Sequence, residues 1–490
     1  MSATTVKPTA TRPEDERLPL GATVAYGLQH VLTMYGGIIA PPLVIGQAAG
    51  LQPDQIGVLI ASCLFMGGVA TLLQTLGVKF FGSQLPLVQG VSFAGVATMG
   101  AIVSQGGGLP AVFGSVIVAS IIGLLIAPLF SQILRFFPPV VTGTVITTIG
   151  LTLLPVAANW VMGGNSKAPD YGSVPNLALA GVTFVIALVL SKVGSGTISR
   201  LSILLAMVLG TVIAIFTGQA DFSKVGTGAI FAIPTPFAFG PPTFNVASII
   251  SMFIVILVTL TETSADIIAV GEIVGTKVDR KRVANGLRAD MISSAVAPVF
   301  GSFTQSAFAQ NVGLVAITGI KSRFVVTAGG GILILLGLFP VVGRVVQSVP
   351  MPVLGGAGVI LFATVAASGI RTLSTVEYKG NMNLIIVASS LGFGLLPVVS
   401  PTIYNKFPDW FITIFHSGIS SAAIMAILLN VLFNHFKAGN SKDSSVFVAG
   451  SDRVLTTQQI RVLREGDRFE NGKLIDCDGK EVPIEPESAH

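Results

Sequence analysis

The sequence predicts an all-α polytopic membrane protein in which fourteen apolar segments cross a lipid bilayer. Charged residues make up 10% of the 490 residues, whereas a soluble globular protein carries about 25%. The mean hydropathy is +0.81, and 51% of the residues are hydrophobic. A soluble chain of this length would need more polar surface to cover its core, so the outer surface must face lipid. The 56 glycines agree, because glycine lets membrane helices approach closely.

Fourteen segments are candidates for spans of about 20 residues. In chain order they are 21–45, 54–77, 84–104, 110–134, 139–160, 176–191, 200–218, 244–273, 286–301, 305–320, 323–343, 350–370, 382–398 and 411–436. An even number of spans puts both ends of the chain on one side. The densest basic run, 277–282, follows the eighth candidate, and short basic loops face the cytoplasm. We therefore expect both termini in the cytoplasm. The net charge of +5 fits such loops better than nucleic-acid binding.

Residues 437–490 differ from the rest of the chain. Charge returns there, the long apolar runs stop, and 439–445 (GNSKDSS) is typical of a linker. The remainder predicts either a small strand-containing appendix or a partly disordered tail, and it carries no catalytic pattern. The two cysteines, Cys63 and Cys477, lie far apart and predict neither a disulfide framework nor a metal cluster.

A short motif occurs twice and suggests an internal repeat. PPVVTG at 138–143 is followed by an apolar run, and PMPVLGG at 350–356 is followed by another. Each motif would open a helix with proline in its first turn, where the missing N–H costs nothing. Two halves of seven spans would have opposite topologies, as in many secondary transporters. The alternative is a chance similarity between two apolar segments.

The eighth candidate carries carboxylates inside an apolar span. Glu262 and Asp266 are four residues apart and share one helix face. Such groups cost about 2.5–3.5 kcal/mol to insert in a bilayer, so they persist where they face protein or water and have a function. Either could hold a proton for part of a cycle or accept N–H groups from a ligand. The alternative is a solvated position at the membrane edge, which we favour only for Glu272.

Two further ionisable groups fall in predicted spans. His30 lies in the first span, either as a hydrogen-bonded core residue or as a functional group. Asp290 opens the ninth candidate, where it would be either a helix N-terminal carboxylate favoured by the dipole or a coupling residue.

Two stretches are too polar to cross lipid as simple helices. They are 305–313 (QSAFAQNVG) and 89–93 (QGVSF), in the tenth and third candidates. Irregular backbone at membrane depth is tolerated only where protein or a cavity shelters it. One such stretch in each half indicates a binding site near the midplane. The alternative is that these amides bond neighbouring helices. Phe93 would be either core packing or a stacking wall for a planar ligand.

Residues 310–319 (QNVGLVAITG) resemble the signature of the nucleobase–ascorbate transporters, the second nucleobase:cation symporter family. The motif is long and specific, and Gln29-His30 and Thr261-Glu262 with Asp266 agree with it. The resemblance covers about residues 20–436 and leaves out the tail.

The resemblance implies fourteen spans in two inverted seven-span repeats, with short antiparallel strands in spans 3 and 10. The implied divisions are an N-terminal tail, core spans 1–4, gate spans 5–7, core spans 8–11, gate spans 12–14 and a C-terminal tail: 1–20, 21–134, 135–243, 244–343, 344–436 and 437–490. Members import uracil, xanthine, urate, related bases or ascorbate with protons or sodium, and they often dimerise.

By position, the resemblance makes Glu262 the substrate-binding carboxylate and Gln310 a second side-chain anchor. Ser92, Phe93 and Gly313 would also contact the substrate. Coupling or supporting roles would fall to four residues: His30, Asp266, Asp290 and Asn311.

The resemblance favours an oxidised purine, xanthine or urate, as the substrate. Uracil-type members have glutamate where this chain has Gln310, and the small Ser92 leaves room for the C8 oxygen of urate. We expect proton-coupled import by an elevator-type movement of core against gate, with sodium as the alternative ion. No cofactor is expected. The expected location is the plasma membrane, the inner membrane in bacteria, as a homodimer.

Two rival functions remain at this point. An anion exchanger of the same architecture fits poorly, because buried Glu262 and Asp266 would repel a bare anion. An intramembrane enzyme lacks support, because the sequence contains neither a His-Glu-x-x-His zinc motif nor a Gly-x-Ser-x-Gly elbow.

Overall fold

The computed structural model describes residues 12–436, apart from 131–136, 224, 227–228 and 379–381, together with 468–470, 473–475 and 481–482. It divides into two compact units, residues 1–440 and 441–490. In the described part of the second unit, three strands form an antiparallel sheet in the order β3-β4-β5: Arg468–Glu470, Lys473–Ile475 and Glu481–Val482. The strand-containing alternative for the tail therefore holds for its described residues.

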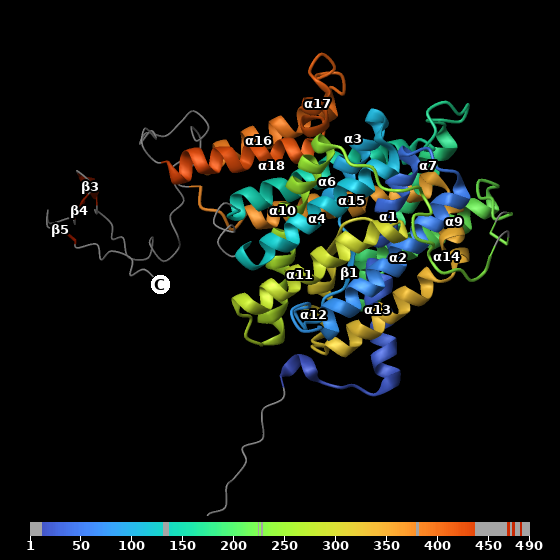
Figure 1. Cartoon of the computed structure of the whole chain (residues 1–490), viewed down its shortest axis with the longest axis horizontal. Coiled ribbons are helices and arrows are strands. Elements are labelled where there is room, and N and C mark those ends of the chain that lie inside the picture. Colours follow the sequence, from blue (N-terminus) through green and yellow to red (C-terminus); the bar gives the residue numbers. More distant parts are fainter. Residues whose placement is uncertain are drawn as a thin grey trace, which may run out of the picture. The chain divides into compact units, whose positions relative to one another are not determined.

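The first unit is a bundle of helices around two short strands (Figure 1). Its α-helices are α1 Leu20–Ala48, α2 Pro53–Leu76, α3 Val96–Ile102, α4 Gly108–Ile126, α6 Pro139–Val161, α7 Val174–Val193, α8 Gly196–Arg200, α9 Ser202–Phe216, α10 Val246–Val274, α11 Arg280–Val296, α12 Ala309–Thr318, α13 Arg323–Gly337, α14 Pro340–Gln347, α15 Met351–Leu373, α16 Met382–Val399, α17 Asp409–Phe415 and α18 Gly418–Asn430. The strands are β1 Gln89–Val91 and β2 Gln305–Ala307. Short 3-10 or π turns are η1 Pro13–Asp15, η2 Phe93–Gly95, η3 Val103–Gly107, η4 Ala127–Leu129, η6 Ala297–Phe300 and η7 Val431–His435.

Nine helical segments among the described residues are long and apolar enough to cross a bilayer, or ten if α13 and α14, bent by 80°, form one span. The chain is thus a multi-pass membrane protein. The remaining candidate spans contain shorter or more polar elements, such as α9, α11 and the β2–α12 segment. The count of fourteen spans stays a prediction, because several segments are too short to qualify by length and composition.

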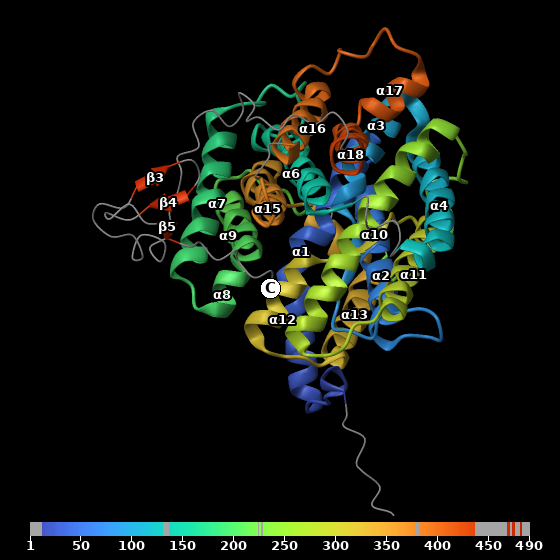
Figure 2. The ribbon, with the colours of Figure 1, turned by 90° about the vertical axis from the view of Figure 1, so that its left-hand side faces the viewer.

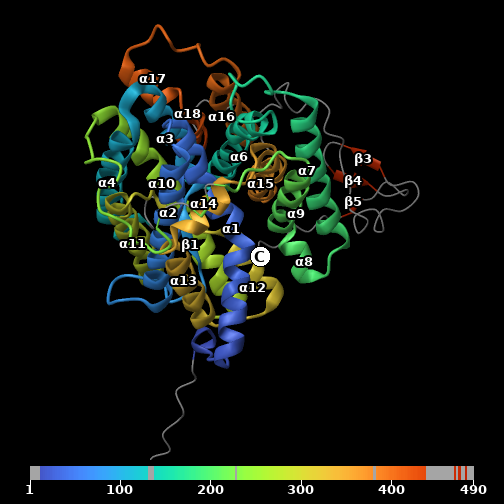
Figure 3. The ribbon, with the colours of Figure 1, turned by 90° about the vertical axis from the view of Figure 1, so that its right-hand side faces the viewer.

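The helices pack in two bundles. The first contains the paired strands β1 and β2, and we call it the ribbon bundle. In it α13 packs against α1 and α2, and α4 packs against α10 and α11. In the second, the α6–α15 bundle, α6 and α15 pack together and are joined by α7, α9, α16 and α18. Figures 2 and 3 show α7 and α9 on one side of this unit and α4 and α11 on the other.

The repeated proline motif stands at the start of α6 and of α15, two helices that pack closely against each other. Pro138 and Pro350 are the N-cap residues of α6 and α15. Gly143, near the start of α6, lies against Leu373 at the end of α15, and Gly355, near the start of α15, lies against Val161 at the end of α6. The two helices therefore run antiparallel, and glycine lets their backbones touch.

The predicted strands in spans 3 and 10 are confirmed. β1 and β2 pair antiparallel, with Gln89 opposite Ala307 and Val91 opposite Gln305. We call this pair the ribbon. Pairing satisfies the backbone groups of two stretches that cannot form helix in a bilayer.

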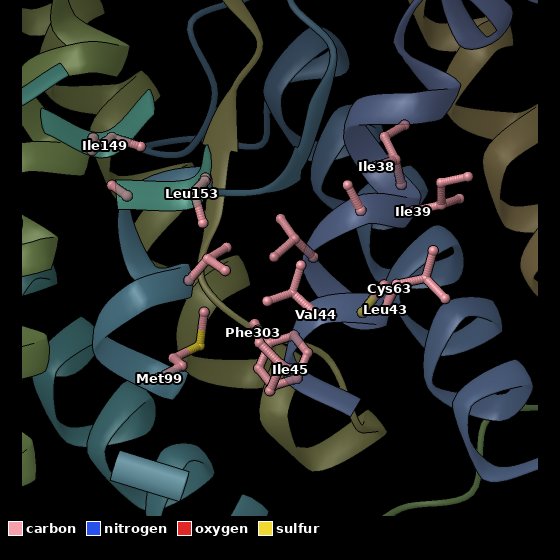
Figure 4. Packing of buried hydrophobic residues seen from close by; sticks show 14 of the residues in the cluster. Ile38, Ile39, Leu43, Val44, Ile45, Cys63, Met99, Ile149, Leu153 and Phe303 are labelled. Atoms are coloured by element: carbon pink, nitrogen blue, oxygen red, sulfur yellow. The ribbon is translucent and has the colours of Figure 1, made fainter. Parts of the chain in front are cut away.

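Apolar side chains fill the space between the two bundles near the ribbon. In Figure 4, Ile38 and Leu43 of α1 lie across from Ile149 and Leu153 of α6, with Met99 of α3 beside them. All five are at most 2% exposed. These five side chains therefore contact one another through dispersion and complementary shape, and not through hydrogen bonds.

Candidate functional site

The ribbon and helix α10 form the frame of the site. α10 is 29 residues long and packs against β2, α12 and η2. From Val246 to Glu262 it rises about 24 Å at 1.5 Å per residue, and a further 18 Å or so follows to Val274. Glu262 therefore lies in the middle part of a helix long enough to span a membrane.

Glu262 is half-buried and faces the second bundle. It lines a narrow cavity with Val258 and Thr261 of α10 and with Thr142 and Val145 of α6. The cavity offers about 10 Å³ to water-sized molecules. Small-molecule pockets usually measure roughly 300–1,000 Å³. In this conformation the space beside the carboxylate is too small for a heterocyclic ligand.

Asp266 lies one turn further along α10 and is also half-buried. Two carboxylates, Glu262 and Asp290, repel its charge, and Arg371 of α15 attracts it. The electrostatic balance of the site thus includes one cation from the other bundle. No sequence pattern singles out Arg371, because it directly follows the predicted span 350–370 and resembles an ordinary loop residue there.

His30 and Asn311 are in direct contact. The Asn311 Oδ1 accepts the backbone N–H of Val88 at 2.6 Å, so its Nδ2 is the donor toward Nδ1 of His30, 2.8 Å away. His30 Nδ1 must then be unprotonated. Since His30 is 2% exposed, the structure gives it the hydrogen-bonded core position. The pair ties α1 to α12 and, through Val88, to the residue that precedes β1.

Asp290 lies inside α11 and not at its start. α11 begins at Arg280, so Asp290 comes almost three turns later. The interpretation as a helix N-terminal carboxylate is therefore wrong. The segment 286–301 began too late because polar residues at 280–285 hid the first turns of the helix.

Thr263 links Asp290 to the ribbon. Its hydroxyl donates to Asp290 Oδ2 at 2.6 Å and accepts the backbone N–H of Ala307 at 3.3 Å. Gln74 of α2 donates to the other carboxylate oxygen at 3.4 Å. Asp290 is 1% exposed, so both neutral donors offset part of the cost of burying it. No local pattern singles out Thr263 or Gln74, because the partners that they bond lie far away along the chain.

Ser92 and Phe93 follow directly after β1. The backbone N–H of Ser92 donates to the Thr304 carbonyl at 2.8 Å, which extends the pairing of the ribbon, and its hydroxyl accepts from Ala94 N–H. Phe93 is half-buried and meets Phe362 of α15 edge to face, with ring centres 6.2 Å apart. The Phe93 ring is therefore a contact between the two bundles.

Gln310 and Gly313 are exposed and lie three residues apart on α12. That spacing puts them on one helix face. They present an amide side chain and bare backbone beside the ribbon, while Asn311 between them points inward and is fully buried. The motif at 310–313 thus contains both exposed residues and the fully buried Asn311.

A larger hollow of about 450 Å³ lies elsewhere, between the start of α10 and α17, with Asn245, Asp409 and Trp410 in its lining. About 24 Å of helix separates it from Glu262. We assign the site to the ribbon, because the ionisable and amide groups of the middle of the chain gather there.

Comparisons with known proteins agree with a transport site. A family model described as the Permease family matches residues 21–403. The chain is 39% identical over 471 residues to the uric acid transporter UacT of Escherichia coli K12, covering 94% of this chain and 97% of the relative. It is 41% identical over 416 residues to the xanthine permease of Bacillus subtilis 168, covering 85% and 94%.

Two solved structures with a similar fold are transporters of other solutes. The murine Slc26a9 anion transporter in the inward-facing state matches with a TM-score of 0.60 at 14% identity, over 86% of this chain and 69% of that one. The transmembrane domain of the cyanobacterial bicarbonate transporter BicA matches with a TM-score of 0.55 at 15% identity, over 84% and 97%. At such identities the likeness concerns the fold alone.

We expect Thr263→Val to destabilise the protein by about 1–3 kcal/mol, because buried Asp290 and the Ala307 N–H lose a partner. Thermal unfolding of the purified protein in detergent measures the effect. Thr259→Val is the matched control, since Thr259 is buried on the same helix but its hydroxyl donates to the Val255 carbonyl. Equal losses for the two variants would contradict the bridging role.

Proposed function

This chain belongs to the nucleobase–ascorbate transporter family, and we propose that it imports an oxidised purine, xanthine or urate. Membership makes it a transporter and not an enzyme. The observation that carries the proposal is the half-buried Glu262 in the middle of α10, a helix that packs against β2 of the ribbon and against α12, which carries the exposed Gln310.

The chemistry of an oxidised purine fits these groups. Xanthine and urate present alternating N–H and C=O groups along their edges. An ionised Glu262 accepts N–H groups, while the Gln310 amide donates and accepts at once. Relatives named for uric acid and for xanthine support both substrates, at 39% and 41% identity.

Small side chains beside the ribbon suit a bicyclic base. Ser92 uses its hydroxyl on the Ala94 backbone, so it adds little bulk toward the substrate. Gly313, with nothing within 4 Å of an added Cβ, leaves open space on α12. Uracil, the alternative base, would fill this space less completely. An anion exchanger is disfavoured, because Glu262 and Asp266 face the site and the similarity to anion transporters is confined to the fold.

We propose that the substrate crosses by an elevator-type movement of core against gate. In this proposal the ribbon bundle would be the core and the α6–α15 bundle the gate. One observation supports this: the space beside Glu262 is about 10 Å³, so the bundles must move relative to each other to admit a base. Near the ribbon the side chains between the bundles are apolar, and the movement would have to break the 2.7 Å hydrogen bond that Trp160 Nε1 of α6 donates to Gln47 Oε1 of α1.

Protons are our proposed coupling ion, with sodium as the alternative. Three carboxylates, Glu262, Asp266 and Asp290, lie close enough to interact. Repulsion and burial make it costly for all three to be charged together. Binding of a proton therefore lowers the cost of the substrate-bound state.

The proposal also covers the topology, the location and the oligomeric state of the protein. We propose fourteen spans in inverted repeats, with both termini in the cytoplasm and the basic loop at 277–282 on the same side. The protein would act in the plasma membrane, the inner membrane in bacteria, as a homodimer.

We expect Glu262→Gln to reduce uptake of labelled xanthine and urate by about 100-fold in cells that carry equal amounts of protein, because the amide cannot hold the substrate N–H groups as an ionised acceptor does. Glu272→Gln is the control, since Glu272 is exposed near the end of the same helix. Wild-type uptake by Glu262→Gln would remove the central assignment.

Gln310→Glu should change the preference among bases. A second carboxylate beside the site accepts N–H groups but cannot donate to a purine C=O. Competition of labelled xanthine uptake by urate, uracil, guanine and hypoxanthine measures the preference of the wild type and the variant. If the two inhibition profiles coincide, Gln310 does not anchor the substrate.

A proton gradient should be sufficient for accumulation. In proteoliposomes of fixed sodium content, we expect labelled xanthine to accumulate when the proton gradient is imposed and to leak out when a protonophore is added. Accumulation that follows a sodium gradient at constant pH would establish the alternative ion.

A further inference from the structure

The polar segment before the first helix is docked against the ribbon bundle. Residues 12–16, which we call the N-terminal strap, contain the 3-10 turn η1. Glu14 is 0% exposed. Its Oε1 accepts from Arg282 Nη2 at 2.5 Å and from the Thr276 hydroxyl at 3.2 Å. A carboxylate is buried at such a place only when a cation is paired with it, so Arg282 holds the strap.

The next two residues of the strap bind a second loop. Asp15 accepts from Arg323 Nε at 2.7 Å, and the Glu16 carbonyl accepts from the Ser322 hydroxyl at 2.6 Å. Partial burial would raise the pKa of Asp15, but hydrogen bonds from Arg323 and Arg12 outweigh it, so this pKa is lowered. Asp15 therefore stays ionised and bound at neutral pH.

These partners lie at helix ends of the ribbon bundle. Thr276 lies between α10 and α11 and Arg282 in the first turn of α11, while Ser322 is the N-cap of α13 and Arg323 its first residue. Arg323 also donates to the Thr75 carbonyl at the end of α2 at 2.7 Å. The strap thus fastens together the ends of several helices that carry the proposed site.

Arg282 extends this contact toward the ribbon. While Nη2 holds Glu14, Nε donates to the Ser83 carbonyl at 2.7 Å, and Nη2 also donates to the Gln84 carbonyl at 3.0 Å. These carbonyls lie just before β1 along the chain. A guanidinium can bind a carboxylate and carbonyls at once because its donors form a planar fork, whereas an ammonium cannot reproduce that geometry.

From Ser83 the contacts continue to Asp290. The Ser83 N–H donates to Gln74 Oε1 at 3.0 Å, and Gln74 Nε2 donates to Asp290 Oδ1 at 3.4 Å. Asp290 in turn accepts from Thr263, which accepts from Ala307 of β2. Hydrogen bonds therefore form a continuous path from the N-terminal strap to Ala307 of β2, the strand that pairs with β1.

We propose that Glu14 and Arg282 are positioning residues for transport: by docking the strap, they orient Gln74 and Asp290 and hold the ribbon in register with α10. This rests on the proposed function. In this proposal residues 12–16 lie outside the substrate site. They nevertheless control how tightly movement of the driving ion is coupled to movement of the substrate. A purely structural strap would instead change only the amount of folded protein.

Hydrogen exchange of the purified full chain tests the path without any substrate. We expect Glu14→Gln to speed amide exchange in peptides from 74–92 and 304–311 and to leave 139–161 and 351–373 unchanged. Glu16→Gln is the matched control, because Glu16 is exposed and uses its backbone carbonyl in the strap. Unchanged exchange at 304–311, or equal acceleration in α6 and α15, would overturn the proposal.

Transport by proteoliposomes tests the consequence. Per folded transporter, Glu14→Gln should lower gradient-driven accumulation of labelled xanthine by about threefold to thirtyfold, while equilibrium exchange of xanthine stays close to the wild-type rate. Arg282→Lys keeps a positive charge beside Glu14 but loses the planar set of donors of the guanidinium, so we expect the same loss of accumulation as for Glu14→Gln. It replaces Glu14→Gln as the test variant if that variant fails to fold. Equal losses of accumulation and exchange overturn the positioning role.

The two tests separate this proposal from the proposed function. If wild-type protein carries neither xanthine nor urate, the proposed function fails while the exchange experiment still decides whether the strap holds the ribbon. If wild type transports and both variants match Glu16→Gln in each assay, the strap proposal alone fails.

Discussion

The rest of this structure depends on the need to pair backbone polar groups inside a bilayer. Residues 89–91 and 305–307 leave helical geometry at membrane depth, where each unpaired N–H or C=O would cost several kcal/mol or so. The two stretches pair with each other, and side chains of neighbouring helices bond further backbone groups: the Ala307 N–H donates to Thr263 and the Gln89 N–H to Thr71. The two halves of the chain are thereby joined at the ribbon, and α10 and α12 must lie where they can cover it.

The same physics explains why the polar side chains form networks instead of lone pairs. Asp290 and Asn311 are both at most 1% exposed, and each bonds groups from two other segments. A buried polar group left half-satisfied is worse than an apolar one, so such groups fix the geometry around them. Glu262 and Gln310 differ, since they are partly or fully exposed. Neighbouring residues of one helix therefore differ in role: Asn311 is buried in a hydrogen-bond network, whereas Gln310 next to it is exposed.

Glycine determines how the two bundles are built. At Gly68 an added Cβ would lie 2.6 Å from the Gly330 carbonyl oxygen, so α2 and α13 touch through their backbones. Within a bundle such contacts bring helix backbones together, whereas between α1 and α6 aliphatic side chains face each other and a hydrogen bond joins Trp160 to Gln47. The proposed elevator movement would therefore repack side chains between the bundles and leave the backbone contacts within each bundle in place. Membrane helices gain little from apolar burial, so close contact and not hydrophobicity holds each bundle together.

Composition and local pattern alone determined the membrane class, most helix positions and the two polar breaks. These features are local: a helix needs about 20 apolar residues to span a bilayer, and a polar break interrupts them wherever it occurs. Only the tertiary structure decided that Asp290 lies inside α11, that His30 bonds Asn311, and that Glu14 is buried against Arg282. Those partners are far apart in the chain. Their meeting depends on which helices pack together, and no local pattern of residues specifies that.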